Sequence, residues 1–586
     1  MINLLSLLAV LAIPAGEPYQ AALMGPTTPT GFLELEAGAP PAELVIDFKN
    51  DVGADALGQL AKSTGLAIRF NSEFSASMER LAKVPVADLA AIDRLLALFK
   101  GRDDVEQVEP NYVYRAFFAP DDPYYKHQWH MDMIHMADAW GRARGRGVVV
   151  AVIDTGVSSG DGSLKPVEDL ADARFVAGYD FVHDQPYADD DHAHGTHVAG
   201  TVAQVTDNGK GVTGVAFAAK IMPIKVLNRG GSGYISDIAE GIAWATDHGA
   251  DVINMSLGGP GRSIVLEKAV DDARRRGVVV VCAAGNGGGK GVGYPAAYDS
   301  AIAVSAMGPD RKLAYYSSWG PQVDIAAPGG DTRVDLNQDG IPDGVLQNTI
   351  VPGDPSRQGY FPFNGTSMAS PHVAGVAALV IGQGITDPDA VERVLKKTAA
   401  PVGDADHYGA GLLDADAATS RVVWRPGLLR LGLAIAFALF TAILARRKQA
   451  LAPQPVGPAF AIALIASACG LFFLRFVETW AWWLFFLTRP LAEWPGVLLG
   501  MNWHLNAAVG SVALPFVLVV LFASSRRLRP LASGFAIGSA AYLLACAIDG
   551  SVNVRWVPGH GLLDTLWLAG NGLLALVIGR FSLPKR

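Results

Sequence analysis

Three side chains in this sequence are of the types that together make a serine hydroxyl reactive. Asp154 ends the apolar run GVVVAVID, His194 opens the small-residue segment HGTHVAGT, and Ser367 lies early in the apolar segment GTSMASPHVAGVAALVI. A serine becomes a nucleophile when a histidine takes its proton and a carboxylate holds that histidine in one tautomer. Taken singly, the aspartate is a turn or capping residue, the histidine is structural and the serine is an N-cap. The chemistry therefore requires that the three residues meet in the fold.

Asn286 is a fourth side chain that this chemistry would use. It closes the segment GVVVVCAAGN, and its amide can join the Ser367 backbone N–H in binding the negative oxygen of a tetrahedral intermediate. The first turn of a helix leaves N–H groups unpaired and favours negative charge, which suits a nucleophile at that place. The four residues together predict acyl transfer through a covalent intermediate at Ser367.

The segments that carry these residues alternate between strand and helix patterns from Gly145 onward. Apolar runs of strand length, such as GVVVAVID and AIAVSA, are separated by helix-like stretches such as ISDIAEGIAWATDHG. Near-continuous Val and Ile strands between helices predict a parallel sheet covered on both faces, the α/β class. In such sheets functional residues gather at the carboxyl ends of the strands, where Asp154 and Asn286 are expected.

Five segments of this region resemble the signature segments of subtilisin-like serine peptidases, the subtilases. In chain order they are AVIDTGV, HGTHVAGT, MSLGG, AAGN and NGTSMASPHVAG. The resemblance predicts a peptidase domain at 121–420 with a three-layer α/β fold. It implies that Asp154, His194 and Ser367 form a catalytic triad and that Asn286 is the oxyanion donor. The other histidines of these segments are then loop or packing residues.

The resemblance also implies where a substrate would bind. The segments GGSG and SLGG resemble the two edges that pair with an extended substrate strand, a form of β-augmentation. A glycine in GVGYPAAY resembles the floor of the first specificity pocket, and no acidic residue stands beside it. The pocket is therefore predicted to be roomy and apolar, with cleavage after bulky apolar residues. The implied substrate-binding residues are Gly231, Ser232, Gly233, Ser256, Leu257, Gly258 and Gly293.

The segment before the peptidase domain forms a smaller unit. Between 41 and 118 the pattern is strand, helix, strand, strand, helix, strand, which is the ferredoxin-like α+β order. By the resemblance, this unit is a propeptide that acts as folding chaperone and inhibitor and is then cut off. The cut would lie between Phe117 and Asp122.

The stretch DLNQDGIPDGVL has the spacing of a calcium-binding loop. Such a loop supplies oxygens from positions 1, 3, 5, 7 and 9, with a turn glycine at 6 and a bidentate acid at 12. Gly340 falls at position 6, but position 12 is Leu346, so either another residue such as Asp331 completes the shell or the affinity is modest. An acidic surface turn is the alternative. The candidate ligands are Asp335, Asn337, Asp339, Ile341 and Asp343.

A second structural calcium site is implied by the resemblance alone. In relatives, the positions of Asp122, Asp169 and Asn208 build a site that joins the mature amino terminus to the core. The loop departs from the family pattern at Gly209 and Lys210. Calcium is thus the predicted cofactor, in a structural role.

The net charge and composition of the chain limit the classes of partner that it is expected to bind. The formal net charge is −9 and the soluble part has no stripe of Lys and Arg, which argues against nucleic acid. Three cysteines are too few for a disulfide framework. The apolar run at 1–16 is predicted to be a signal peptide, with an uncleaved anchor as the alternative. The predicted partners are protein or peptide substrates, the chain's own propeptide and a lipid bilayer.

Long apolar runs dominate the chain after Leu428. Each approaches the length that crosses about 30 Å of hydrocarbon. Clusters of Arg and Lys follow the first, third and fifth runs, which puts them on one side and the peptidase domain on the opposite, extracytoplasmic side. The aromatic stretch at 480–487 lies in the interface or re-enters the membrane. The five runs are 428–445, 458–474, 506–523, 531–548 and 562–579, and they form a predicted membrane domain at 428–579.

The sequence therefore predicts a membrane-anchored serine endopeptidase, periplasmic or extracellular, that matures by removing its propeptide. One alternative is a membrane sensor or assembly protein whose peptidase-like domain only binds peptides, and the intact Asp-His-Ser set speaks against it. Another alternative makes the membrane domain a transporter or an assembly platform with the peptidase as an accessory.

Overall fold

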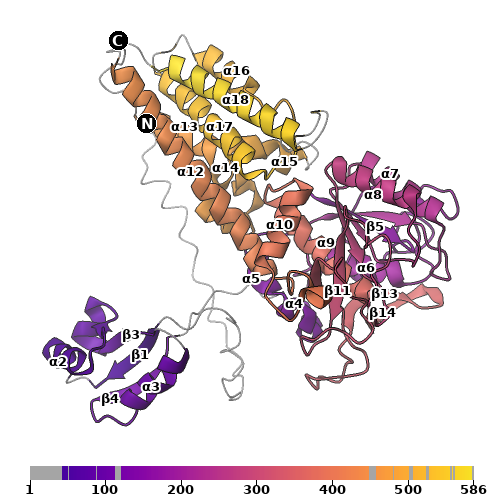
Figure 1. Ribbon diagram of the computed structural model, residues 1–586, viewed down its shortest axis with the longest axis horizontal. Coiled ribbons are helices and arrows are strands. Elements are labelled where there is room, and N and C mark those ends of the chain that lie inside the picture. Colours follow the sequence, from indigo (N-terminus) through magenta and orange to yellow (C-terminus); the bar gives the residue numbers. More distant parts are fainter. Residues whose placement is uncertain are drawn as a thin grey trace. The chain divides into compact units, whose positions relative to one another are not determined.

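The computed structural model describes residues 43–49, 52–86, 89–111, 120–447, 457–479, 481–499, 506–522, 525, 527–554, 557 and 561–583. The chain divides into two compact units, Met1–Ala116 and Phe117–Arg586 (Figure 1). The predicted signal peptide at 1–16 lies outside the described residues, and so do residues 117–119 of the predicted cleavage region.

The first unit is a four-stranded antiparallel sheet with two α-helices beside it. The strands follow the order β2-β3-β1-β4 across the sheet. Along β1, every second residue is buried, so one face of the sheet packs against the helices while the other does not. The elements are β1 (Glu43–Phe48), α2 (Ala54–Thr64), β2 (Arg69–Phe70), the π-helical turn η3 (Ser75–Glu79), β3 (Leu81–Pro85), α3 (Leu89–Phe99) and β4 (Val105–Pro110).

The second unit is built on a parallel sheet, as predicted. Its strand order is β12-β11-β10-β9-β5-β8-β6, and β7 also pairs with β8. The four central strands β5, β9, β10 and β11 are buried along their whole length, which explains their continuous Val, Ile and Ala runs. The strands are β5 (Val149–Asp154), β6 (Arg174–Phe175), β7 (Tyr179–Asp180), β8 (Lys220–Lys225), β9 (Val252–Met255), β10 (Val279–Ala283), β11 (Ile302–Met307) and β12 (Ile325–Pro328).

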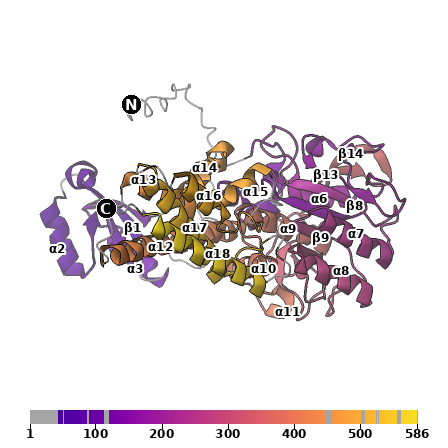
Figure 2. The same ribbon diagram turned by 90° about the horizontal axis from the view of Figure 1, so that it is seen from above.

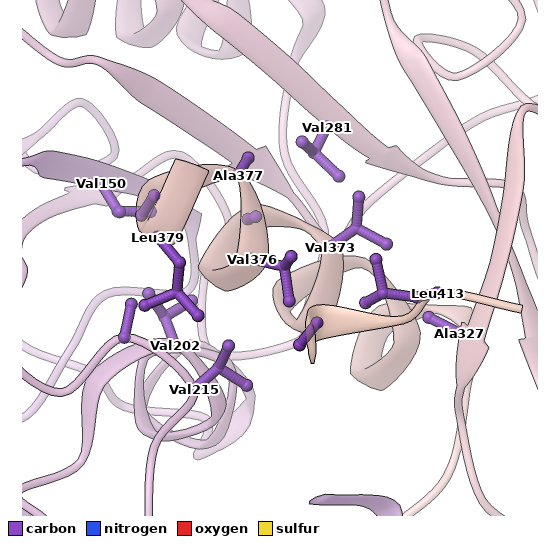
Figure 3. Packing of buried hydrophobic residues seen from close by; sticks show 14 of the residues in the cluster. Val150, Val202, Val215, Val281, Ala327, Val373, Val376, Ala377, Leu379 and Leu413 are labelled. Atoms are coloured by element: carbon purple, nitrogen blue, oxygen red, sulfur yellow. The ribbon is translucent and has the colours of Figure 1, made fainter. Parts of the chain in front are cut away.

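Helices cover both faces of this sheet. Val150 and Val152 of β5 pack on one face with α6 (His194–Ala203) and α9 (Thr366–Gly382). Ala151 and Ile153 point the other way, toward α7 (Ile235–Asp247) and α8 (Ile264–Arg275), which lie together in both views (Figures 1 and 2). Figure 3 shows α9 in the core, with its apolar side chains between the sheet and α6. The helix that carries Ser367 is therefore almost wholly buried.

Shorter elements complete the α/β region that is built on the parallel sheet. A long antiparallel hairpin, β13 (Val345–Val351) and β14 (Asp354–Phe363), lies beside α6 and precedes α9. The remaining elements are η4 (Tyr125–His127), α4 (Trp129–Met133), α5 (Met136–Trp140), η5 (Glu168–Leu170), α10 (Pro388–Thr398) and α11 (Ala405–Tyr408).

The C-terminal region is helical. It begins with α12 (Ala415–Arg447), which leaves the α/β region and enters the bundle without a break (Figures 1 and 2). The bundle core is α13, α17 and α18, because α17 packs on both of the others. After α12 the elements are α13 (Pro458–Ala468), η6 (Phe472–Thr479), η7 (Trp482–Leu484), α14 (Phe485–Thr488), η8 (Leu491–Glu493), α15 (Trp494–Leu499), α16 (Ala513–Phe522), α17 (Arg529–Asp549) and α18 (Leu562–Phe581).

Among the described residues, three helices are long and apolar enough to cross a membrane, namely Ala415–Leu444 of α12, α17 and α18. The pair Pro458–Ala468 and Phe472–Glu478 would make a fourth span, but it is bent by 65°. The sequence predicted five continuous runs. The run at 458–474 is interrupted because Gly470 takes a left-handed conformation, and the run at 506–523 is helical in its described part only over Ala513–Phe522.

Candidate active site

Asp154 and His194 meet at the carboxyl edge of the sheet. Asp154 is the last residue of β5 and is fully buried, and His194 is the first residue of α6. His194 Nδ1 lies 2.7 Å from Asp154 Oδ1, and the Thr155 backbone N–H donates to the same oxygen at 2.7 Å. The carboxylate therefore fixes the imidazole with Nδ1 as the protonated nitrogen, and Nε2 is left to act as a base.

The surroundings of His194 raise its pKa above the ordinary value. Burial lowers it, but the charge of Asp154, the hydrogen bond to Asp154 and the charge of Asp190 together outweigh burial. The imidazolium that forms when His194 takes a proton is thus stabilised at this place.

Asp190 and Lys225 hold the loop that precedes α6, and sequence reasoning missed both. Asp190 is fully buried, and it accepts from Thr155 Oγ1 at 2.8 Å and Thr196 Oγ1 at 2.6 Å, as well as from three backbone N–H groups. Lys225, also buried, donates to the Thr155 carbonyl and to Asp191, both at 2.6 Å. The only signal in the sequence was an acidic run before HAHGTH and a lysine in an apolar strand.

Ser367 lies in the first turn of α9 and shares a cleft with His194 and Asn286. In this structure, its hydroxyl donates to the Ser256 carbonyl at 3.2 Å. Ser256 Oγ in turn donates to the Ser367 carbonyl at 2.7 Å and lies 2.9 Å from Ser370 Oγ. Ser256, which was predicted as a substrate-edge residue, therefore also supports the start of α9.

Asn286 is oriented by the residue before Ser367. Its Oδ1 accepts from Thr366 N and from Thr366 Oγ1, both at 2.9 Å. Because the oxygen must face these donors, the amide nitrogen is the atom available to a ligand in the cleft. The structure thus brings together the four residues predicted to carry the chemistry.

The two predicted substrate edges each approach residues of this site, because a Cβ on Gly231 would stand 3.2 Å from His192 Nε2 and the Ser256 carbonyl accepts from Ser367 Oγ. Gly231, Ser232 and Gly233 lie in the loop before α7, where Asn228 Oδ1 accepts from Ser232 N at 3.3 Å. A side chain at Gly233 would collide with the carbonyl of Val226, so the backbone approach there requires glycine.

The second edge lies beside the predicted specificity pocket. Ser256, Leu257 and Gly258 follow β9, and Gly259 exchanges two backbone hydrogen bonds of 2.9 Å with Tyr294. Gly293 N donates to the Ala284 carbonyl, also at 2.9 Å. A Cβ on Gly293 would stand 3.4 Å from the Gly259 carbonyl, so Gly293 lies against the second edge.

The predicted calcium loop at 335–343 is compact, but its side chains bond within the chain. Asp339 Oδ2 lies 2.6 Å from His127 Nδ1, Asp335 accepts from the backbone of Asp339 and Gly340, and Asp343 accepts from Leu336 N. Within the described ranges, no three His, Cys, Asp or Glu residues are grouped as metal ligands. The pKa of Asp343 is raised by burial and then by Asp335, Asp339 and Asp331. The carboxylates repel one another, and a cation would relieve this repulsion.

Asp122 and Asp169 fit a cation more closely. Both are buried, and Oδ1 of each has no hydrogen-bond partner among the described residues. Their other oxygens accept from Asp207 N at 2.7 Å and from Val212 N at 2.8 Å, so both face the same loop. Burial raises the pKa of each to about 6. Asn208 lies in this loop, where its Oδ1 accepts from Lys210 N at 2.9 Å.

Comparison with known proteins assigns the peptidase region. The family model described as the subtilase family matches residues 145–411. Subtilisin DY of Bacillus licheniformis is 44% identical over 280 residues, which cover 47% of this chain and 92% of that protein. The chain belongs to the subtilase family. It is a subtilisin-like serine endopeptidase, and its substrates are proteins.

Other relatives of this subtilase extend further along the chain. An extracellular protease of Xanthomonas campestris is 35% identical and covers 72% of this chain and 77% of its own. A solved protease structure from Pseudoalteromonas arctica covers 52% of this chain and all of its own, with 37% identity and a TM-score of 0.47. A second model, described as a domain of unknown function, matches residues 421–586.

Proposed function

We propose that this subtilase is a membrane-anchored endopeptidase in which Asp154, His194 and Ser367 are the catalytic triad and Asn286 is the oxyanion donor. The observation that carries the proposal is the 2.7 Å contact between His194 and the buried Asp154, at a cleft that Ser367 and Asn286 also line. An activated histidine beside a serine at a helix start is what acyl transfer requires.

The proposed reaction begins at the Ser367 hydroxyl. On substrate binding, the Ser367 hydroxyl turns from the Ser256 carbonyl toward His194 Nε2, a tightening expected of catalytic hydrogen bonds. His194 takes the hydroxyl proton while Oγ attacks the scissile carbonyl, and Asp154 stabilises the imidazolium. The Asn286 amide and the Ser367 N–H bind the oxyanion. His194 then protonates the leaving amine, and a water activated by His194 releases the acyl group.

Substrate preference follows from the two edges and Gly293. An extended chain would add to the backbone at Gly231–Gly233 and Ser256–Gly258, with its side chain before the scissile bond next to Gly293. Glycine at that place leaves room, so large apolar residues are the preferred class.

The first unit, residues 43–111 in its described part, is proposed to be the propeptide of this subtilase. Its removal tests the triad directly. Full-length enzyme should lose the prosegment on expression, whereas Ser367→Ala should retain it, because cutting requires the nucleophile. The processed enzyme, profiled on a peptide library, should cleave after Phe, Leu, Tyr or Met. Normal processing of Ser367→Ala would overturn the triad, and a profile led by Arg and Lys would overturn the pocket assignment.

The placement of helix ends supports an extracytoplasmic peptidase. α12 starts in the peptidase region and ends at Arg447, and the C-terminal end of α17 returns to that region, where Gly550 O accepts from Arg393 at 3.3 Å. The N-terminal end of α17, at Arg529, is therefore on the far side with the end of α12. Basic clusters at 445–448 and 526–529 on one side favour a cytoplasmic location for that side.

The order in which the helices of the bundle contact the peptidase region also supports five membrane passes. After α12 the chain returns through α13 to reach α9 at Arg475, and it runs through α16 back to Arg529. The described helical parts of these two passes, α13 and α16, have 11 and 10 residues, about half of what a straight helical span requires.

Members of the family commonly bind structural calcium, and we assign the first such site here to Asp122, Asp169 and Asn208. Two buried carboxylate oxygens that have no hydrogen-bond partner in the described part of the chain, beside one loop, are suitable hard ligands. The loop at 335–343 is a weaker candidate, because its carboxylates already bond to backbone N–H groups and to His127.

A further inference from the structure

The peptidase region is joined to the helical bundle by a helix and not by a linker. Ala415, Ala418 and Val422 of α12 are buried in the same core as α9. Leu428 and Leu439, further along the same helix, expose 56% and 58% of their surface. From Ala415 to Leu428 the helix rises about 20 Å. The change from peptidase core to outward-facing apolar surface therefore occurs within a few turns of one continuous helix.

A loop of the bundle makes a second attachment. The Ser551 carbonyl, just after α17, accepts from Thr386 N at 3.0 Å and Asp387 N at 3.4 Å. Asn553 N donates to Thr386 Oγ1 at 3.3 Å. These contacts lie immediately before α10, so the bundle holds the peptidase region at a point far from α12 in sequence.

A buried ionic network makes the third attachment. Glu493 accepts from Arg430 at 2.8 Å and from Arg475 at 3.1 Å, and Glu478 pairs with Arg489 at 2.7 Å. The exposed fraction of each of these side chains is 11% or less. The network has three arginines and two glutamates, and Asp549 at the end of α17 also interacts with Arg430.

Two arginines of this network face the C-terminal end of α9, the helix that carries Ser367 in its first turn. Arg489 Nη1 donates to the Gly382 carbonyl at 2.8 Å, and Arg475 Nη1 donates to the Gln383 carbonyl at 3.0 Å. The last carbonyls of a helix lack partners and carry partial negative charge, which arginine satisfies. The bundle thus binds α9 itself.

The segment that carries Arg475 and Arg489 also exposes aromatic side chains on its surface. Phe473, Trp482, Trp483 and Phe486 expose between 40% and 55% of their surface, and the guanidinium of Arg146 in the peptidase region lies 5.3 Å from the centre of the Trp482 ring. Exposed Trp next to apolar spans is typical of the membrane–water interface, because its ring is both apolar and polar. The network therefore lies at the level of the membrane surface.

Because the end of α9 contacts this network, the length of α9 limits how far Ser367 can lie from the membrane surface. Ser367 and Gly382 are fifteen residues apart on α9, which corresponds to about 22 Å at 1.5 Å per residue. Gly382 contacts Arg489 directly. A polypeptide extends about 3.3 Å per residue, so roughly seven extended residues span that distance.

We propose that the substrates of this subtilase are other membrane-anchored proteins, cut in extended segments close to the membrane surface. The proposal rests on the proposed function of the triad and on the membrane location of the bundle. A peptidase fixed at one height meets a tethered segment at high effective concentration, whereas a soluble protein gains nothing from the attachment.

The test uses the wild-type full-length enzyme in lipid vesicles, with substrates that share one recognition sequence containing a large apolar residue. Two substrates carry a single transmembrane helix followed by a Gly/Ser linker of about 15 or about 60 residues before that sequence, and a third is soluble. The shorter linker should be cleaved about twofold or more faster than the longer one, because the range of heights over which the linker spreads the recognition sequence grows as roughly the square root of linker length. It should also exceed the soluble substrate by about tenfold or more at equal bulk concentration.

Enzyme with Ser367→Ala supplies the background rate in the same vesicles. Equal rates for both linkers and for the soluble sequence would overturn the juxtamembrane proposal while leaving the peptidase intact. Cleavage of the long linker alone would also overturn it, because the cleft would then be far from the surface. Loss of soluble-peptide cleavage in the wild type would instead count against the proposed function.

Discussion

His194 is the residue whose charge decides activity, and its raised pKa sets the pH dependence. Only the neutral imidazole can take the Ser367 proton, so kcat/KM should rise with pH through a pKa above the ordinary value of 6.5. Asp154→Asn removes the charge and changes the partner of Nδ1. The acid limb of the profile should then shift to lower pH, and kcat should fall by about 10⁴-fold. The measurement is a pH series of kcat/KM on a soluble apolar peptide for both enzymes.

The raised pKa of His194 has the opposite effect on stability, which decreases over the pH range in which activity increases. A histidine whose folded pKa is raised contributes stability that is fully present below pH 6.5 and is lost as pH rises through the folded pKa. The enzyme therefore gains activity over the range in which this pair loses its stabilising effect. An acid limb at the same pH in Asp154→Asn and in wild type would show that Asp154 does not set the His194 pKa.

Residues that lie in a recognisable sequence motif could be predicted from the sequence. Residues whose role depends on contacts with distant parts of the chain could not. Asp154, His194, Ser367 and Asn286 were each marked by their neighbours in the chain. Asp190 was not, because its role comes from the Thr155 hydroxyl, 35 residues earlier in the sequence.

At the scale of elements, period and composition predicted the parallel sheet and its covering helices, since buried strands require continuous apolar runs. The helical bundle was harder to predict. Hydropathy detects apolar runs but not the point where a helix stops, so the turn at Gly470 and the short α16 were not expected. The contact between α9 and Arg489 spans 107 residues of sequence, and no local pattern encodes it.

We predict that calcium bound by Asp122 and Asp169 beside the loop between α6 and β8 contributes to the stability of the enzyme. With burial raising the pKa of Asp122 and Asp169 to about 6, the ionised pair costs stability at pH 8 unless a cation offsets it. Chelation with EDTA should therefore lower the melting temperature strongly at pH 8. At pH 5, where both groups are largely protonated, the effect should be small. Scanning calorimetry of enzyme blocked by a serine-directed inhibitor measures both values without self-digestion.

Two variants separate the candidate calcium sites. Asp169→Asn should abolish most of the EDTA effect at pH 8, whereas Asp339→Asn should leave it largely unchanged. The reverse pattern would move the structural calcium to the loop at 335–343, and an EDTA effect equal at both pH values would remove Asp122 and Asp169 as ligands.

At the scale of the whole molecule, the peptidase region and the bundle should unfold as one unit, and Arg489 tests this. Arg489→Met leaves Glu478 without its closest cation and the Gly382 carbonyl without its donor. Breaking a buried pair in this way costs about 3–5 kcal/mol. Arg275→Met is the matched control, because Arg275 is 61% exposed and its surface pair contributes at most about 0.5 kcal/mol.

Hydrogen exchange should show faster opening of both α9 and α17 in Arg489→Met. Faster exchange confined to α17 would mean that the peptidase folds independently of the bundle, and the active site would then not be held at a fixed height above the membrane.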